Sequence, residues 1–399
     1  MTPRFDVIVC GGGLAGAAAA LAAGRSAKNV ALIAPQNPIP DGRTTALMMP
    51  SVRFLKQLGI DSDFLEQAAP LKTMRIMDDT GRLLRPPPLT FRAQEISEEA
   101  FGYNILNGEL QKILMHALHN EERVTVFEVA AEKITHEEDG VRVALEDGAQ
   151  LDGSILAGSD GRNSLVRRSA GISSRSWSYP QTAIVLNFDH EYDHDDTSNE
   201  FHTPAGPFTQ VPLGRHRSSL VWAMSPPDAD ERKQDTDDVL GQHVEERLHS
   251  MLGKVKITSE RGFFPFSGLI ANQFGKGRSV LLGEAGHVFP PIGAQGFNLG
   301  LRDVSIFMDL LRQYGTGGES KIGDAFDRGR RSDVGSRTYG VDILNRSLLN
   351  GFLPVQMARY AGMTALAHIP PLRAFAMREG MSPGQSMLSG AAKRHQGFG

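Results

Sequence analysis

The chain has 399 residues, of which 40% are hydrophobic and 22% are charged. This composition is typical of globular proteins and excludes wholesale disorder, and the length allows two or three domains with large buried cores. Lys and Arg number 42 against 46 Asp and Glu, and the resulting net charge of −4 offers no broad electrostatic surface for nucleic acid.

The N-terminal segment reads FDVIVC, then GGGLAG, AAAALAAG and NVALIA. An apolar strand, a glycine turn, an Ala-rich helix and a second strand form a βαβ unit. Gly11 permits a tight turn, Gly13 lets the backbone approach a pyrophosphate, and Gly16 lets the helix pack on the strand. The free N–H groups of the helix favour an anion, so we expect a dinucleotide site here. The alternative is a glycine turn that binds no ligand.

More helices and strands of the same pattern follow. The spacing predicts helices over 51–60, ending at Gly59, and over 108–120. The segment 124–151 alternates between apolar and polar residues and has Asp-Gly turns at 139–140 and 147–148, which favour hairpins. A strand, SILAGSD, then leads into GRNSLVRRSAG.

Residues 178–270 differ, because they contain strand-like segments, an acidic loop over 189–196 and one polar helix around 230–252. The segment 279–287 returns to the α/β pattern, and a long helix is expected from near Gly296 past Leu311. From Gly340 onward the chain is apolar, mostly helical and basic. The charged residues of this tail are Arg346, Arg359, Arg373, Arg378, Lys393 and Arg394, against Asp342 and Glu379.

These elements predict an α/β fold in which a β-sheet domain interrupts a Rossmann-like dinucleotide-binding domain, with a helical C-terminal segment. We assign the cofactor domain to residues 1–72, 97–177 and 276–339. The β-rich substrate domain takes 73–96 and 178–275, and the helical segment takes 340–399.

The glycine turn also predicts an acidic residue about 20 positions on, to accept hydrogen bonds from the ribose. The second strand ends instead at Ala34, whose side chain cannot accept a hydrogen bond. Either Gln36 or a backbone group substitutes, or nucleotide affinity is reduced.

Several other candidate functional residues also allow a purely structural interpretation. His190 and His194, among several acidic residues, could hold a metal, but we favour a solvated acidic loop and predict no metal site. His287 is either catalytic or, as we favour, a loop-structuring residue. We interpret Cys10 as a small buried side chain rather than a reactive thiol. Trp222 either lines a substrate pocket or fills the core of a sheet.

The glycine turn, GSDGRNSLVR (158–167) and LLGEAGHVFPPIGAQGFNLGLRD (281–303) together resemble the class A flavoprotein monooxygenases, which hydroxylate aromatic rings with FAD and NAD(P)H. More narrowly, the chain is similar to the ubiquinone-biosynthesis hydroxylases. The supporting segments are DGRTTALMMPSVRFLKQLGI (41–60), QVPLGRHRSSLVWAM (210–224), DILNRSLLNGFLPVQMARYAGM (342–363) and PPLRAFAMREGM (370–381).

The resemblance implies that the Rossmann-like domain is an FAD-binding domain of the glutathione-reductase type. It also implies a reaction in which NAD(P)H reduces FAD, O₂ adds to the flavin, and a C4a-hydroperoxide hydroxylates a polyprenylated phenol. No catalytic side chain is assigned, because the cofactor carries the chemistry. The resemblance implies the following FAD-binding residues: Gly11, Gly13, Leu14, Ala15, Gly16, Arg43, Asp160, Gly283, Glu284, Pro291, Gly293, Ala294, Gln295, Gly296, Phe297 and Asn298.

This chain departs from the family pattern at three places. Glu284 replaces the usual Asp, Gly293-Ala294 inverts the usual order, and Ala34 lacks the acid. Two rival functions therefore stay open. One is a flavin hydroxylase of another aromatic substrate, and the other is a weakly FAD-binding, non-catalytic subunit of a ubiquinone-biosynthesis assembly.

Location and partners follow from composition and from the tail. One cysteine excludes an intramolecular disulfide, and no run reaches the ~18 apolar residues that span a bilayer, so we expect a cytoplasmic protein. The basic, apolar tail predicts peripheral contact with the inner face of the membrane or with a biosynthetic complex. The alternative is a tail that packs on the cofactor domain.

Overall fold

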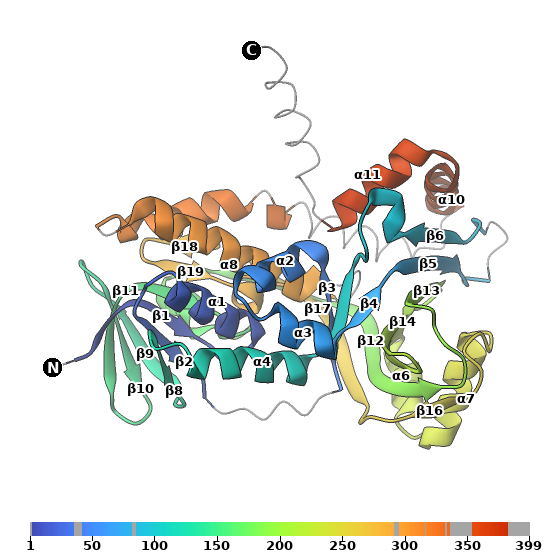
Figure 1. The fold of residues 1–399 in the computed structure, drawn as a ribbon, viewed down its shortest axis with the longest axis horizontal. Helices are drawn as coiled ribbons and strands as arrows, with labels where there is room; N and C mark the ends of the chain where they lie inside the picture. The colour runs from blue at the N-terminus through green and yellow to red at the C-terminus, as the bar shows by residue number, and fades with distance from the viewer. Residues whose placement is uncertain are drawn as a thin grey trace, which may run out of the picture.

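The computed structural model describes residues 2–35, 42–81, 85–290, 295–315, 317–331, 333–335 and 353–381. Two large β-sheets, each with its own helices, form the two halves of the molecule (Figure 1). The described helices are α1 (Leu14–Arg25), α2 (Met49–Gln57), α3 (Asp61–Gln67), α4 (Asn107–His119), α5 (Leu165–Ser169), α6 (Pro226–Arg232), α7 (Asp237–Arg247), α8 (Gln295–Tyr314), α10 (Leu353–His368) and α11 (Pro370–Met381), with 3-10 turns η1 (Ala93–Ile96), η2 (Gly283–Ala285) and η3 (Glu319–Lys321).

The first sheet has a parallel core with the predicted βαβ unit at its centre. Its main path runs β18, β19, β11, β1, β2, β8, and the hairpin β9–β10 joins it through β11. Val7 lies opposite Val30 on one side and Ile155 on the other. Its strands are β1 (Arg4–Cys10), β2 (Val30–Ile33), β8 (Val124–Phe127), β9 (Ala131–His136), β10 (Val141–Leu145), β11 (Gln150–Gly158), β18 (Gly275–Lys276) and β19 (Ser279–Leu281).

Alternation along the central strand divides the core into two layers, because successive side chains of a strand point to opposite faces. Val7 and Val9 pack in the cluster of α1, α4 and α8, whereas Ile8 and Cys10 pack against the hairpin β9–β10 and α5. Burial, and then the charge of Asp160, raises the pKa of the Cys10 thiol. Cys10 is therefore a protonated core side chain, as predicted.

The second sheet is largely antiparallel, with one parallel pair, β5 and β13. Its path runs β20, β17, β12, β15, β14, β13, β5, β6, and β16 joins at β12. Its strands are β5 (Thr73–Asp78), β6 (Leu89–Arg92), β12 (Ser174–His190), β13 (Thr197–Thr203), β14 (Gly206–Gly214), β15 (Arg217–Met224), β16 (Val255–Ile257), β17 (Gly262–Ala271) and β20 (His287–Val288).

Helices α6 and α7 cover one face of this second sheet. Trp222 belongs to the core beneath them and meets the Phe208 ring edge-on, with ring centroids 5.3 Å apart. Trp222 therefore contributes to the core of the sheet, and it also lines a cavity of about 620 Å³. A role for Trp222 in a substrate pocket stays a prediction.

The prediction of a single helix around residues 230–252 is wrong. The chain forms α6 and α7 instead, because the Thr236 side chain accepts the Val239 N–H and starts a second helix. Ser225 caps the first helix in the same way, through the Asp228 N–H.

A three-stranded sheet, β3 (Thr44–Met48), β7 (Gly102–Leu106) and β4 (Ala69–Leu71), lies between the two halves. α2 leaves β3 directly and ends near Gly59, whose φ of +61° is the left-handed conformation that glycine tolerates. The observed architecture confirms the predicted α/β class, while the domain boundaries stay a prediction.

The described part of the tail forms α10 and α11, which lie beside β5 and β6 at the end of the second sheet (Figure 1). Met363 and Met377 are buried against Phe91 of β6. Among the described helices, none combines the length and apolarity needed to cross a membrane.

Candidate FAD site

The first glycine turn, between β1 and α1, requires glycine at two positions. Gly11 has a φ of +109°, and a Cβ there would lie 2.2 Å from the Ser159 carbonyl oxygen. A Cβ at Gly16 would lie 1.8 Å from the Gly11 carbonyl oxygen. The backbone therefore folds tightly on itself and on the end of β11.

Gly13 differs from Gly11 and Gly16, because the described structure leaves open space where its side chain would be. It caps α1 with an ordinary φ of −67°, and a Cβ there would meet no atom within 4 Å. The first N–H groups of a helix lack intrahelical partners and carry partial positive charge. This cradle fits a pyrophosphate.

A cleft of about 810 Å³ extends from this turn across the carboxyl ends of β1, β2, β8 and β11. Ligands of open α/β sheets bind at this edge. The lining residues are Cys10, Gly11, Gly12, Gly13, Ile33, Ala34, Pro35, Gln111, Met115, Val126, Glu128, Ala130, Ala131, Ile134, Ser159, Asp160, Asn163 and Leu165.

Asp160 lines the cleft, but its carboxylate is also bonded to α5. It accepts hydrogen bonds from Ser164 Oγ at 2.5 Å, Leu165 N at 2.6 Å and Val166 N at 3.1 Å. The partial positive charge of a helix N-terminus stabilises such a carboxylate. Asp160 thus fixes the turn after β11, and its predicted contact with the cofactor stays a prediction.

The second glycine turn, predicted from the far end of the chain, lies against the first. A Cβ at Gly283 would sit 3.5 Å from the Ala15 Cβ and 4.0 Å from the Gly300 Cα. This confirms the expectation that the two turns converge. Leu14 and Ala15 begin α1, and Glu284, in the second turn, is exposed.

Buried charges hold this second turn in place. Asp303 on α8 accepts hydrogen bonds from Gly283 N at 2.8 Å and Arg330 Nε at 2.6 Å, and its Oδ2 lies 2.7 Å from His287 Nε2. Burial alone would raise the pKa of Asp303, but Arg330 and His287 outweigh it and keep that pKa below its usual value. His287 therefore structures the loop.

The start of α8 is tied to the segment that follows β3. Asn298 Oδ1 accepts from Met48 N at 2.9 Å and Ser51 Oγ at 2.7 Å, and its Nδ2 donates to the Ala46 carbonyl at 2.8 Å. The Asn298 amide therefore joins α8 to β3 and α2. Its predicted contact with the flavin ring stays a prediction.

The remaining residues predicted around the flavin ring are only partly described. Gln295 begins α8, space is open beside Gly296, and the partly buried Phe297 packs on the main core. Pro291, Gly293 and Ala294 lie outside the described residues.

Arg43 does not join the residues that line the cleft. Its guanidinium lies over the Phe264 ring of β17, 5.3 Å from the ring centroid. The predicted contact of Arg43 with FAD is untested. The structure places its side chain between the first half of the molecule and the second sheet.

Gln111 lines the cleft, a position that the sequence did not predict for it. Its Nε2 donates to the Gly12 carbonyl at 2.6 Å, and its buried Oε1 has no partner among the described residues. The amphipathic pattern of 108–120 predicted the helix, but gave no signal that this position faces the glycine turn.

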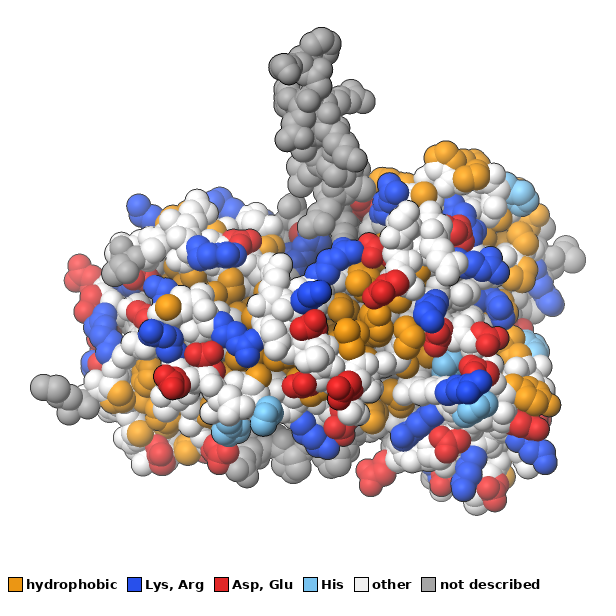
Figure 2. All heavy atoms as spheres, in the orientation of Figure 1, with side chains coloured by type: hydrophobic (Ala, Val, Ile, Leu, Met, Phe, Trp, Pro, Cys, Tyr) orange, Lys and Arg blue, Asp and Glu red, His pale blue; other side chains and the backbone are white. Residues whose placement is uncertain are grey.

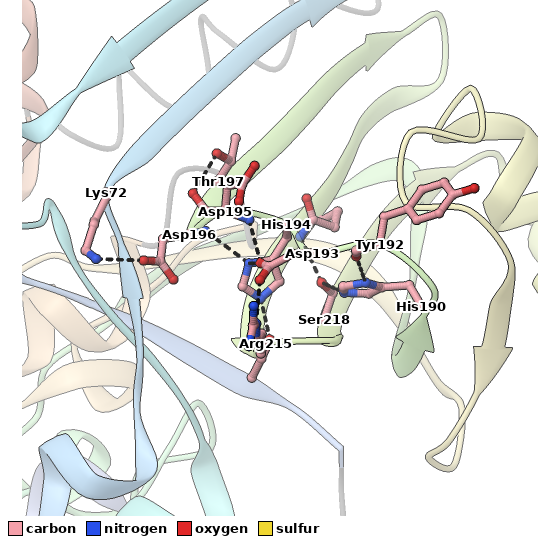
Figure 3. Close-up of polar contacts among 12 residues, drawn as sticks. Lys72, His190, Tyr192, Asp193, His194, Asp195, Asp196, Thr197, Arg215 and Ser218 are labelled. Carbon is pink, nitrogen blue, oxygen red and sulfur yellow. Dashed lines mark hydrogen bonds and ion pairs between the residues drawn. The ribbon is translucent and has the colours of Figure 1, made fainter.

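The histidines of the acidic loop are buried anchors (Figure 3). His190 Nδ1 lies 2.7 Å from the Tyr192 carbonyl oxygen, and His190 Nε2 lies 2.9 Å from Ser218 Oγ. His194 Nε2 contacts the Gly214 carbonyl oxygen. Burial lowers the pKa of His190, and His194 adds to the effect.

Two acidic side chains of this loop form ion pairs with basic residues (Figure 3). Asp193 pairs with Arg215 at 2.7 Å, which lowers the pKa of Asp193 to about 2, and Asp196 pairs with Lys72 at 2.8 Å. In the described part of the chain, no three His, Cys, Asp or Glu residues gather as a metal site would require. The loop is acidic, as predicted, but its histidines are not solvated.

Comparison with known proteins supports the site. Residues 4–335 match the family model described as FAD binding domain. The chain is 30% identical over 394 residues to ubiquinone hydroxylase UbiL of Rhodospirillum rubrum, covering 94% of this chain and 89% of that protein. It is 28% identical to 3-demethoxyubiquinol 3-hydroxylase of Escherichia coli, covering 94% and 97%.

Solved structures share the fold. The p-nitrophenol 4-monooxygenase PnpA of Pseudomonas putida gives a TM-score of 0.77 at 19% identity, covering 96% of this chain and 97% of that one. A variant of Klebsiella pneumoniae HpxO complexed with FAD gives 0.77 at 16% identity, covering 95% and 99%.

The cleft at the glycine turn and the match over residues 4–335 define the class as FAD-dependent monooxygenases. FAD is therefore the cofactor, and the cradle at Gly11–Gly13 fits its pyrophosphate. Within that class, the chain belongs to the family of the ubiquinone-biosynthesis hydroxylases.

Proposed function

We propose that this chain hydroxylates the aromatic ring of a polyprenylated phenol during ubiquinone biosynthesis, with NAD(P)H and O₂ as co-substrates. Two observations carry the proposal: the likeness to UbiL, which spans 94% of the chain, and the family match over residues 4–335, which includes both glycine turns. The chemistry that FAD supplies when bound is reduction by NAD(P)H and activation of O₂ for transfer of one oxygen atom to the ring.

The two turns would hold opposite ends of the cofactor. The backbone of Gly11 and Gly13 and the N-terminus of α1 would bind the pyrophosphate. The second turn, with Gly283 and Glu284, and the start of α8 would hold the flavin end, where the partial positive charge of a helix N-terminus stabilises negative charge on the ring. The ion pairs of Asp303 and the amide of Asn298 would keep these groups in position.

The function is tested by quinone-precursor profiling in cells that lack this protein. We expect a ubiquinone precursor lacking one ring hydroxyl to accumulate, and its structure would identify the ring position. Re-expression of the wild-type chain should clear that precursor. An unchanged quinone pool would contradict the proposal, and product analysis with candidate phenols would then test hydroxylation of another aromatic substrate. A purified protein that shows no flavin bands at saturating FAD would support the non-catalytic subunit.

For the tail, we propose that α10 and α11 rest on an anionic membrane surface, where a polyprenylated substrate resides. Arg373 anchors α11 to the protein, because its guanidinium pairs with Glu95 at 2.6 Å and lies 4.6 Å from the centroid of the Phe91 ring. Large hydrophobic side chains stay exposed on the pair of helices, and apolar side chains gather over α10 and α11 in Figure 2. These exposed residues are Met357, Tyr360, Ile369, Leu372 and Phe375, 37% to 56% exposed.

Vesicle sedimentation tests this surface. The full chain should sediment with vesicles containing phosphatidylserine. The variant Leu372→Glu/Phe375→Glu should lose about tenfold or more in vesicle affinity, because charges replace two exposed apolar side chains that would contact the lipid. Leu65→Glu is the matched control, since Leu65 is 41% exposed on α3, far from the tail in the sequence. Equal sedimentation of the double variant and the control would contradict membrane contact by this surface.

A further inference from the structure

The end of β2 lacks the acid that a dinucleotide turn requires, although its position is suited to the task. Ala34 lines the cleft, and a Cβ placed on Gly12 would lie 2.4 Å from the Ala34 Cβ. The end of β2 therefore lies directly against the glycine turn. An alanine methyl group cannot accept a hydrogen bond, so the Ala34 side chain does not supply the acceptor that the ribose hydroxyls of a bound nucleotide usually find at this position.

The neighbouring strand places a carboxylate at the same edge of the sheet. β2 and β8 are parallel, with Ile33 opposite Phe127, and Ala34 N donates to the Phe127 carbonyl at 2.8 Å. Glu128 directly follows the last residue of β8. It is exposed and lines the cleft together with Ala34. Neighbouring strands lie about 4.8 Å apart, a gap that an extended glutamate side chain can cross.

The residues that line the cleft include two carboxylates and an apolar wall. Glu128 and Asp160 are the carboxylates among the described lining residues. Asp160 follows β11, on the far side of the glycine turn from β2, whereas Glu128 follows β8, the strand that pairs with β2. Beside Glu128 the wall is apolar, formed by Val126, Ala131 and Ile134, and such a wall suits a planar base.

We propose that Glu128 accepts hydrogen bonds from the ribose hydroxyls in the adenosine half of FAD, so that the acceptor has moved from the end of β2 to the end of β8. The inference rests on the proposed FAD site. With the pyrophosphate on Gly11 and Gly13, the adenosine then extends past Ala34 toward β8, and Glu128 is a binding residue of this chain.

Flavin fluorescence titration of the purified protein tests the assignment. Glu128→Gln removes the charge and keeps the shape, and we expect FAD to bind about 10- to 100-fold more weakly, the loss typical of a charge-assisted hydrogen bond. FMN lacks the adenosine half, so its affinity should not change. Glu132→Gln is the matched control, because Glu132 is exposed on the adjoining β9 but does not line the cleft.

A carboxylate returned to the end of β2 should rescue the loss. Ala34→Glu in the Glu128→Gln background should recover most of the FAD affinity, whereas the same change in the wild type should gain less, because two carboxylates would then face each other. The inference is overturned if Glu128→Gln binds FAD as wild type does, or if FMN affinity falls equally. Failure of the wild-type protein to bind FAD would instead contradict the proposed function.

Discussion

Replacement of Gly13 by alanine separates binding of FAD from folding of the glycine turn. A Cβ at this position meets no atom within 4 Å, and the φ of −67° suits any residue. The methyl group would nevertheless project beside the backbone that we propose for the pyrophosphate. Gly13→Ala should therefore fold normally and bind FAD poorly.

The magnitudes follow from general values for helix caps and for hydrogen bonds. Alanine is a poorer N-cap than glycine by several tenths of a kcal/mol, while Gly→Ala stabilises by about 0.4–1 kcal/mol through the unfolded chain, so the free energy of unfolding should change by less than about 0.5 kcal/mol. Loss of one hydrogen bond to a charged phosphate costs about 1.5–3 kcal/mol, which is a rise of about 10- to 150-fold in the Kd for FAD.

Two measurements check this prediction. Urea denaturation of the FAD-free protein gives the free energy of unfolding, and flavin fluorescence titration gives the Kd. Gly16→Ala is the contrasting variant, since its Cβ would lie 1.8 Å from the Gly11 carbonyl oxygen and should destabilise the fold itself. Wild-type FAD affinity in Gly13→Ala would show that the pyrophosphate does not lie against Gly13.

Three further predictions concern the structures around the site. Asp303→Asn removes the buried carboxylate that pairs with Arg330, which then keeps its ion pair with Asp333, and should lower the free energy of unfolding by about 3–5 kcal/mol in a denaturation experiment; an unchanged midpoint would contradict the importance of the Asp303–Arg330 pair. Because burial lowers the pKa of His190, the unfolded state binds more protons below pH ~6.5, and stability should fall with falling pH by at most ~1.4 kcal/mol per unit for this residue. His190→Gln should remove that component, and identical pH profiles would argue against it. Arg373→Ala breaks the pair with Glu95, so limited proteolysis should cut near α11 faster than in the wild type; equal rates would show that the pair does not anchor the helix.

The sequence predicted those parts of the fold that depend on local pattern. The apolar alternation around Val7 and the glycines of the first turn indicated the βαβ unit. The convergence of Gly11 and Gly283 was predicted through resemblance, and it has a general cause, because the carboxyl ends of parallel strands share one edge of a sheet. The break near Thr236 was missed because helical periodicity continues through a capping residue whose effect depends on its side-chain conformation.

The site contacts between distant segments were not predictable in this way. Gln111 lies on a helix that was predicted, but its bond to Gly12 depends on how that helix packs. Asn298 and Arg43 carry groups suited to a cofactor, yet one bonds to β3 and α2 and the other lies over Phe264. Such pairings join residues that are far apart in the sequence, so no local spacing encodes them.

A crystal structure of the protein soaked with FAD would show whether the two glycine turns hold one cofactor. We expect one extended cofactor, with its pyrophosphate on the backbone of Gly11–Gly13 and its flavin ring beside the second turn at Gly283 and the start of α8. Electron density for FAD elsewhere on the molecule, with the cleft at the first turn empty, would contradict it.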